Sequence, residues 1–111
     1  MIKKENRLPA RGVGRVLSKG RSFATANLSC RFIPNKPQFP LKITVVVGKK
    51  VAQKAVLRNY IKRKTREAFD GQIGSTSGVS IVVFPKKTVE EIDFENLKQE
   101  AAECLKRSQF S

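Results

Sequence analysis

Five side chains between residues 58 and 66 have the types and spacing that suit contact with phosphate groups. On a helix of about 100° per residue they fall within one arc of about 140°; they are Arg58, Asn59, Lys62, Arg63 and Arg66. Arginine offers a rigid fork of donors, lysine a mobile charge, and asparagine an amide that can read a sugar or base edge. Apolar residues gather on the opposite flank: Leu57, Ile61 and Ala68.

A merely hydrated helix face is the alternative explanation of this charge run. Such faces usually mix in acids at i,i+4, which offsets the repulsion between like charges. Between Lys54 and Glu67 the only acid is Glu67 itself. Each like-charged pair costs a few tenths of a kcal/mol, so the arrangement favours a polyanion lying opposite.

The charge of the whole chain supports the same partner. A chain of 111 residues forms one domain with one modest core. Its net charge of +14 and pI near 10.4 are extreme for that size and predict a nucleic-acid partner. The charge is also regional, because residues 1–70 hold 18 Lys and Arg against 3 Asp and Glu, whereas residues 71–111 hold 5 against 6.

Enzyme chemistry carried by the protein itself is disfavoured. The chain has no histidine, the commonest general base and metal ligand. Cys30 and Cys104 are far apart in sequence, which excludes a CxxC metal site and predicts two buried free thiols in a reducing cytosol. Four acids lie close together in sequence: Glu90, Glu91, Asp93 and Glu95. They could form a catalytic pair or a Mg²⁺ site. However, they lie where the start of a helix favours negative charge, so helix capping explains them better.

Neither end of the chain predicts targeting to a membrane. No apolar run approaches 18 residues and the first residues lack a hydrophobic signal core, so we expect a cytoplasmic protein. Residues 1–7 are polar and basic and predict a mobile arm on a single nucleic-acid-binding domain spanning residues 1–111.

Local patterns predict an α+β sandwich with helices against one mixed sheet. A short helix opens at Pro9 and ends at Gly20, and the alternation of Leu28, Cys30 and Phe32 indicates a half-buried strand. Residues 41–47 predict an interior strand because they end in a β-branched run, and residues 79–84 predict a second buried strand. The basic helix lies between these two strands, and a last helix follows Asp93.

One longer pattern resembles a known family. Lys49-Lys50-Val51, then the run from Ala55 to Arg63, then Arg66-Glu67, all after a β-branched strand, resembles the bacterial ribonuclease P protein component. The resemblance covers most of the chain. It implies a two-layer sandwich with a mixed four-stranded sheet, similar to a domain of a small-subunit ribosomal protein. It also implies a left-handed crossover around the basic helix, whereas general rules favour a right-handed one.

The resemblance also implies a function. Members of this family bind a large catalytic RNA and help it to remove the 5′ leader from precursor tRNA. The RNA performs the hydrolysis with bound Mg²⁺, so the protein is the assisting subunit of an endoribonuclease and holds no cofactor tightly. The expected partners are therefore ribonuclease P RNA and precursor tRNA, with no membrane and no small-molecule substrate.

The resemblance further implies two sets of site residues. The RNA-binding set is Lys49, Lys50, Lys54, Arg58, Asn59, Tyr60, Lys62, Arg63 and Arg66. The leader cleft lies between the first helix and the sheet, at Val13, Leu17 and either Arg31 or Phe32. Tyr60 stands where the family has a second arginine, and its ring could stack on a base for about 1–3 kcal/mol.

Two rival functions stay open at this point. A ribosome-associated structural protein could use the same platform on ribosomal RNA. A self-contained nuclease would need the acids of residues 90–95 to hold Mg²⁺. Double-stranded DNA binding through a helix-turn-helix is disfavoured, because strands flank the basic helix in sequence.

Overall fold

The computed structural model describes residues 2–74 and 76–109. The elements follow one another in the order η1 (Lys4–Asn6), α1 (Ala10–Lys19), β1 (Arg21–Ala24), β2 (Leu28–Pro34), β3 (Lys42–Val45), α2 (Ala55–Ile73), β4 (Val79–Pro85), η2 (Lys87–Glu90) and α3 (Phe94–Gln109). Helices and strands are mixed along the chain, as the sequence predicts for the α+β class.

The strands form one mixed four-stranded sheet in the order β1-β2-β4-β3. Strands β1, β2 and β4 pair antiparallel, while β3 runs parallel to β4. The prediction that residues 41–47 form an interior strand is wrong, because β3 lies at an edge and β4 takes the interior position. The core face of β3 is nevertheless buried, and Leu8 N donates to Ile43 O at 3.0 Å along part of its outer edge.

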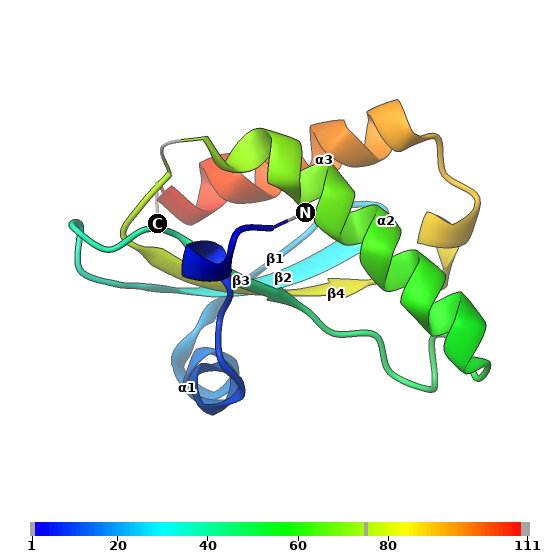
Figure 1. The fold of residues 1–111 in the computed structure, drawn as a ribbon, viewed down its shortest axis with the longest axis horizontal. Coiled ribbons are helices and arrows are strands. Elements are labelled where there is room, and N and C mark those ends of the chain that lie inside the picture. Colours follow the sequence, from blue (N-terminus) through cyan, green and yellow to red (C-terminus); the bar gives the residue numbers. More distant parts are fainter. Residues whose placement is uncertain (1, 75, 110–111) are drawn as a thin grey trace.

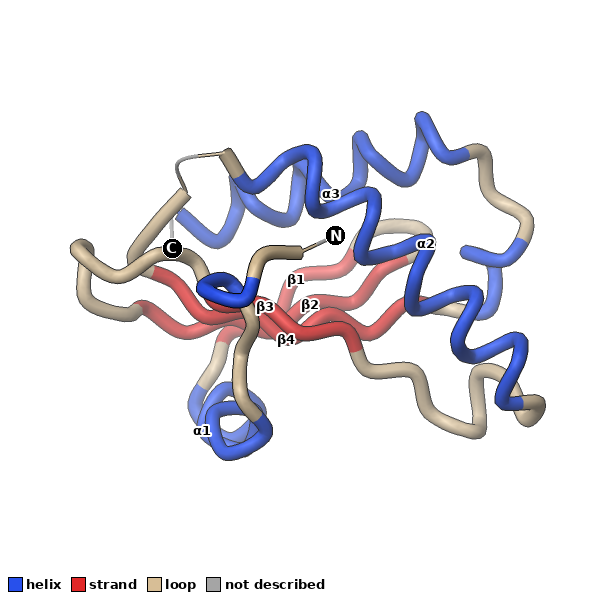
Figure 2. The backbone as a smooth tube through the Cα atoms, viewed as in Figure 1, coloured by secondary structure: helices blue, strands red, loops and turns tan. Residues whose placement is uncertain are grey.

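Helices lie on both faces of this sheet (Figures 1 and 2). Helices α2 and α3 cover one face and enclose the main core, whose fully buried members include Leu28, Ile61, Phe69 and Leu97. This part is the two-layer sandwich that the resemblance implies. Helix α1 packs on the opposite face, against β2 and β4.

The connection β3–α2–β4 is left-handed, as the resemblance implies. In Figure 1 both strands run from left to right, β3 lies nearer the viewer than β4, and α2 returns above them. General rules favour the opposite hand for a parallel crossover.

The mobile arm predicted for residues 1–7 is not what the structure shows for residues 2–7. Ile2 is only 6% exposed and belongs to the main core. Asn6 is buried, and its Nδ2 donates to Leu41 O at 2.8 Å. One apolar side chain and one satisfied amide therefore hold this basic segment against the sheet, while Met1 lies outside the described residues.

Helix α1 begins after Pro9 and ends at Gly20, as predicted. Gly20 has φ −76°, so the chain does not need glycine there for a left-handed turn. It needs glycine for space, because a Cβ at this position would lie 2.3 Å from Val16 O and 3.0 Å from Phe32 O.

Helix α2 runs to Ile73, six residues beyond the basic run that ends at Glu67. Phe69 and Ile73 continue its buried face, and Gly74 ends it with φ 51°.

The two cysteines are buried free thiols, as predicted. The Cys104 thiol and burial together raise the pKa of Cys30 well above its usual range. Both side chains therefore act as small apolar groups between β2 and α3. None of the helices described here has the length and apolar character that crossing a membrane would require.

Candidate nucleic-acid interface

Helix α2 turns one face to the core and the other to solvent. Its buried residues recur every three or four positions and pack toward α3 and η2: Ile61, Thr65, Ala68, Phe69 and Ile73. Asn59, Tyr60, Arg63 and Arg66 are exposed on the other side, and Lys62 is half-buried. Burial of Ile61 and Ala68 and exposure of Asn59, Arg63 and Arg66 agree with the predicted division of the helix, whereas Arg58 and Lys62 are half-buried. The RNA contacts of these residues stay a prediction.

Three lysines extend the cationic surface to the start of α2. Lys49 and Lys50 are exposed in the loop after β3, and exposed Lys54 is the residue that precedes the helix. The first turn of α2 holds no acid and no side chain caps it, so the positive end of the helix dipole adds to these charges. None of the three lysines forms an ion pair within the part of the chain that the structure describes.

Arg58 differs from the other predicted RNA contacts because it already binds its own chain. Its Nη1 donates to Ala52 O at 3.0 Å and to Gln53 O at 2.7 Å, and the residue is half-buried. The guanidinium group thus ties the loop before α2 to the first turn. It has five N–H groups, so donors remain for a phosphate.

Tyr60 lies among cations. Its ring centroid is 5.9 Å from Arg63 Cζ and 5.8 Å from Lys64 Nζ, within the range of cation–π attraction. The side chain is 38% exposed. A base that stacks on this ring would therefore bring its phosphates close to positive charge.

Lys64 has a structural position that nothing in the sequence marks. Its Nζ donates to Val89 O at 2.9 Å and to Ile92 O at 2.5 Å, so the ammonium group joins α2 to the segment around η2. A charge pattern cannot distinguish this lysine from its neighbours, because the carbonyl groups that accept its hydrogen bonds lie more than 20 residues further along the chain.

Among the acids of residues 90–95, one caps a helix, as the sequence analysis predicts. Asp93 Oδ1 accepts a hydrogen bond of 3.2 Å from Glu95 N, at the start of α3. Within residues 2–74 and 76–109, no group of three or more His, Cys, Asp or Glu side chains could hold a metal ion.

The predicted leader-cleft residues divide between the two faces of β2. Phe32 is 5% exposed and belongs to the main core under α2 and α3, so its assignment to the cleft is wrong. The alternation of β2 explains this, because Phe32 shares its face with Leu28 and Cys30. Arg31 lies on the opposite face, toward α1, and its buried Nε has no hydrogen-bond partner among residues 2–74 and 76–109.

A groove of about 310 Å³ lies beside α1. Gly12, Val16 and Ile33 help to line it, together with Phe39 from the loop after β2. Val13 and Leu17 are half-buried on α1 but do not line this groove. Phe39 is 42% exposed and was not predicted as a site residue, although an exposed aromatic side chain between two prolines could have been noticed in the sequence.

These features define a small α+β protein with a cationic surface for nucleic acid. The profile of the ribonuclease P family matches residues 2–109. The chain therefore belongs to the family of bacterial ribonuclease P protein components, and its partner is an RNA.

Relatives and solved structures agree with this assignment. The ribonuclease P protein component of Picosynechococcus sp. is 32% identical over 106 residues, covering 94% of this chain and 90% of the relative. That of Streptococcus agalactiae is 31% identical over 91 residues, covering 82% of each chain.

The RNase P protein of Thermotoga maritima superposes with a TM-score of 0.77 at 29% identity, covering 91% of this chain and 96% of that one. A Staphylococcus aureus RNase P protein mutant gives a TM-score of 0.79 at 25% identity, with 96% and 90% covered. The ribosome-associated alternative is not favoured by these relatives.

Proposed function

We propose that this protein binds the catalytic RNA of ribonuclease P through α2 and the loop before it, and assists the removal of the 5′ leader from precursor tRNA. The RNA subunit, with Mg²⁺ that it holds itself, supplies the hydrolytic chemistry. The protein positions the RNA through cations and contacts the leader on the face of the sheet that carries α1.

One observation carries the RNA-binding half of this proposal. Helix α2 and the loop before it carry seven cations that are exposed or half-buried: Lys49, Lys50, Lys54, Arg58, Lys62, Arg63 and Arg66. None of them forms an ion pair within the described residues. A surface of that kind neutralises phosphates and releases their counterions, which is the main source of affinity for RNA.

The leader-binding half rests on the opposite face of the sheet. Arg31 there carries a buried Nε that has no hydrogen-bond partner within the described part of the chain, and exposed Phe39 lies at the groove beside α1. Lys36 Nζ lies 5.8 Å from the centroid of the Phe39 ring, and an aromatic ring beside a cation suits a single strand of RNA, because every base has a face that can stack. Phe39 thus replaces Phe32 as the aromatic candidate for leader contact.

The test is 5′-end cleavage of a precursor tRNA at low Mg²⁺ by a bacterial ribonuclease P RNA, with and without the protein, and by the protein alone. We expect stimulation that requires the RNA subunit, and no cleavage by the protein alone. Phe39→Ala should reduce stimulation for a substrate with a long leader more than for one with a single leader nucleotide. Cleavage by protein alone, or no stimulation by a protein that still binds this RNA, would contradict the proposal.

A further inference from the structure

Three uncharged residues form a patch on the exposed side of the basic helix α2. Val56, Asn59 and Tyr60 stand at positions i, i+3 and i+4, which are neighbours on the surface of a helix. All three are exposed, Val56 at 82% and Tyr60 at 38%. The first turns of this cationic helix therefore present an uncharged patch, whose side chains have no charge to pair with a phosphate.

Neither the core nor the stability of the helix accounts for this uncharged patch. The buried side of α2 is formed by other residues, among them Ile61 and Thr65. A β-branched valine has a lower helix propensity than alanine, and Val56 is too exposed to gain much from packing. Asn59 forms no hydrogen bond within the residues that the structure describes. The three side chains are therefore free to contact a partner.

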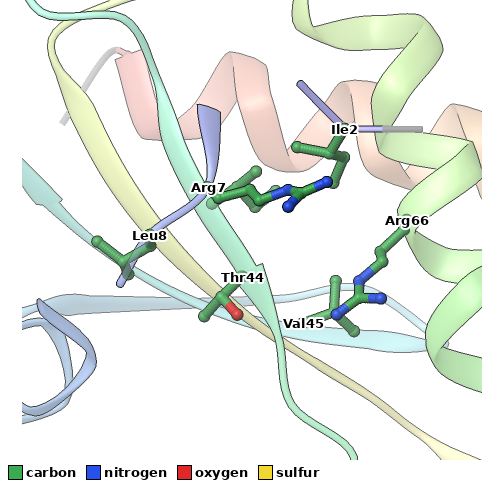
Figure 3. A pocket seen from close by; sticks show the side chains of 7 residues that line it. Ile2, Arg7, Leu8, Thr44, Val45 and Arg66 are labelled. Carbon is green, nitrogen blue, oxygen red and sulfur yellow. The ribbon is translucent and has the colours of Figure 1, made fainter. Parts of the chain in front are cut away.

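Cations lie on both sides of the uncharged patch. The ring centroid of Tyr60 is 5.9 Å from Arg63 Cζ and 5.8 Å from Lys64 Nζ, and Lys64 is itself held by carbonyl groups around η2. On the other flank of α2, Arg66 extends toward Val45 of β3 (Figure 3). A nucleotide on the patch would therefore find positive charge for its phosphates on either side.

We propose that the uncharged patch binds one unpaired nucleobase of the RNA partner. The base stacks on the ring of Tyr60, packs against the methyl groups of Val56, and forms a hydrogen bond at its edge with the amide of Asn59. An amide offers both donors and an acceptor, which suits the edge of a base, and stacking on a ring requires a base that is not paired. The inference rests on the proposed function and deepens it, because it adds a base contact to an interface of phosphate contacts.

The salt dependence of binding distinguishes a base contact from a phosphate contact. The affinity for ribonuclease P RNA is measured at several salt concentrations for the wild type, Tyr60→Phe and Tyr60→Ala. We expect Tyr60→Phe to bind within about twofold of the wild type, because it keeps the ring. Tyr60→Ala should bind about 5- to 150-fold more weakly at every salt concentration, with an unchanged slope of log K against log salt, since no phosphate contact is lost.

Further variants control for folding and for the loss of an amide. Tyr60→Leu keeps apolar volume without the ring, and it should weaken binding as Tyr60→Ala does. Asn59→Ala should weaken binding about 3- to 10-fold, again with an unchanged slope. Gln99→Ala is the matched control and should bind like the wild type, because it removes an exposed amide from α3.

Three results of this experiment would overturn the inference. They are wild-type affinity in Tyr60→Ala, equal weakening in Tyr60→Phe and Tyr60→Ala, and a slope reduced in magnitude by about 0.7–0.9, the value for one lost phosphate. Each would leave the proposed function intact as long as the wild type binds the RNA and stimulates cleavage.

A second experiment detects the stacked base directly. The chain has one tyrosine and no tryptophan, so every tyrosine ring signal of the full chain labelled with ¹³C-tyrosine comes from Tyr60. Two single-stranded probes of equal length and charge are compared, hexaadenylate and the same ribose-phosphate backbone without bases. We expect the ring proton signals to move upfield with hexaadenylate only, because a stacked base shields them. Equal shifts with both probes, or no shift with either, would overturn the inference.

Discussion

Arg58 Nη1 lies 2.7 Å from the backbone carbonyl oxygen of Gln53, so one of the predicted RNA contacts also holds its own loop in place. Exposed Arg63 has no such hydrogen bond within the described residues. We therefore expect Arg58→Ala to weaken RNA binding by about 1–3 kcal/mol and to lower the free energy of unfolding by about 1 kcal/mol. Arg63→Ala should weaken RNA binding by a similar amount and leave stability within about 0.5 kcal/mol. Urea unfolding and RNA titration of both variants check this, and an equal loss of stability in both would contradict it.

Substitutions of Lys64 and of Lys62 should likewise differ in their effects on stability and on RNA binding. The ammonium group of Lys64 binds the carbonyl oxygens of Val89 and Ile92, so Lys64→Met leaves two partly buried acceptors unpaired. We expect a loss of about 1–3 kcal/mol in unfolding free energy with RNA affinity nearly kept. Lys62→Met should reduce RNA affinity and nearly keep the unfolding free energy, since Lys62 lies on the cationic side of α2. The prediction fails if Lys64→Met reduces RNA affinity more than Lys62→Met in samples confirmed to be folded.

Local sequence patterns predict α2 and β4 well, because their side chains are arranged by periodicity within each element. The period of 3.6 residues places Ile61 and Ala68 in the core, and the continuous apolar run of β4 is buried as expected. The boundaries of α1 also follow from local chemistry, at Pro9 and Gly20.

The features that the sequence did not predict depend on contacts between distant segments. The alternation of β2 already places Phe32 on one face with Leu28 and Cys30, but which helices cover that face depends on tertiary packing, which puts α1 on the opposite side. The edge position of β3 depends on strand order, and Ile2 becomes a core residue only because the N-terminal segment packs against β3. The position of Lys64 likewise depends on carbonyl groups supplied by η2 and the residues after it.

Two glycines at α1 should respond oppositely to alanine. A Cβ at Gly20 would lie 2.3 Å from Val16 O, so the end of α1 must shift and we expect Gly20→Ala to destabilise the protein by about 1–3 kcal/mol. A Cβ at Gly14 would meet no atom within 4 Å, and Gly14 lies inside the helix. Gly14→Ala should therefore stabilise the protein by about 0.5–1 kcal/mol. Thermal unfolding of the two variants tests the pair, and a stabilising Gly20→Ala would show the close approach to be wrong.

Protonation of Glu100 in acid should lower the free energy of unfolding. Partial burial by itself raises the pKa of this carboxyl group. Hydrogen bonds from Thr25 and from the side chain and backbone of Asn27, with the charge of Lys86, more than offset that effect and lower the pKa below its usual value. Asn27 N lies 2.8 Å from Oε1, and Asn27 Nδ2 lies 2.5 Å from Oε2.

The pKa of Glu100 is lower in the folded state than in the unfolded state. The ionised carboxylate therefore contributes to the free energy of unfolding above the unfolded-state pKa of about 4.3, and this stabilisation is lost as pH falls through the folded-state pKa. Glu100→Gln should reduce stability at pH 7 by at most about 1 kcal/mol, since the residue is only partly buried. The variant should also show a flatter dependence of stability on pH below about 5. Glu103→Gln on the exposed side of α3 is the control, and identical acid profiles for the wild type and Glu100→Gln would contradict the account.

The most direct test of the RNA interface is the salt dependence of binding to ribonuclease P RNA, measured for the wild type and for variants of two helices. If five of the cations on α2 and the loop before it each neutralise one phosphate, the slope of log K against log salt should be about −3.5 to −4.5. Removing Lys62 and Arg63 together should reduce its magnitude by about 1.4–1.8, whereas Lys98→Gln and Lys106→Gln on α3 should leave it unchanged. A wild-type slope near zero, or an equal reduction from the α3 variants, would contradict the assignment of α2 as the RNA-binding face.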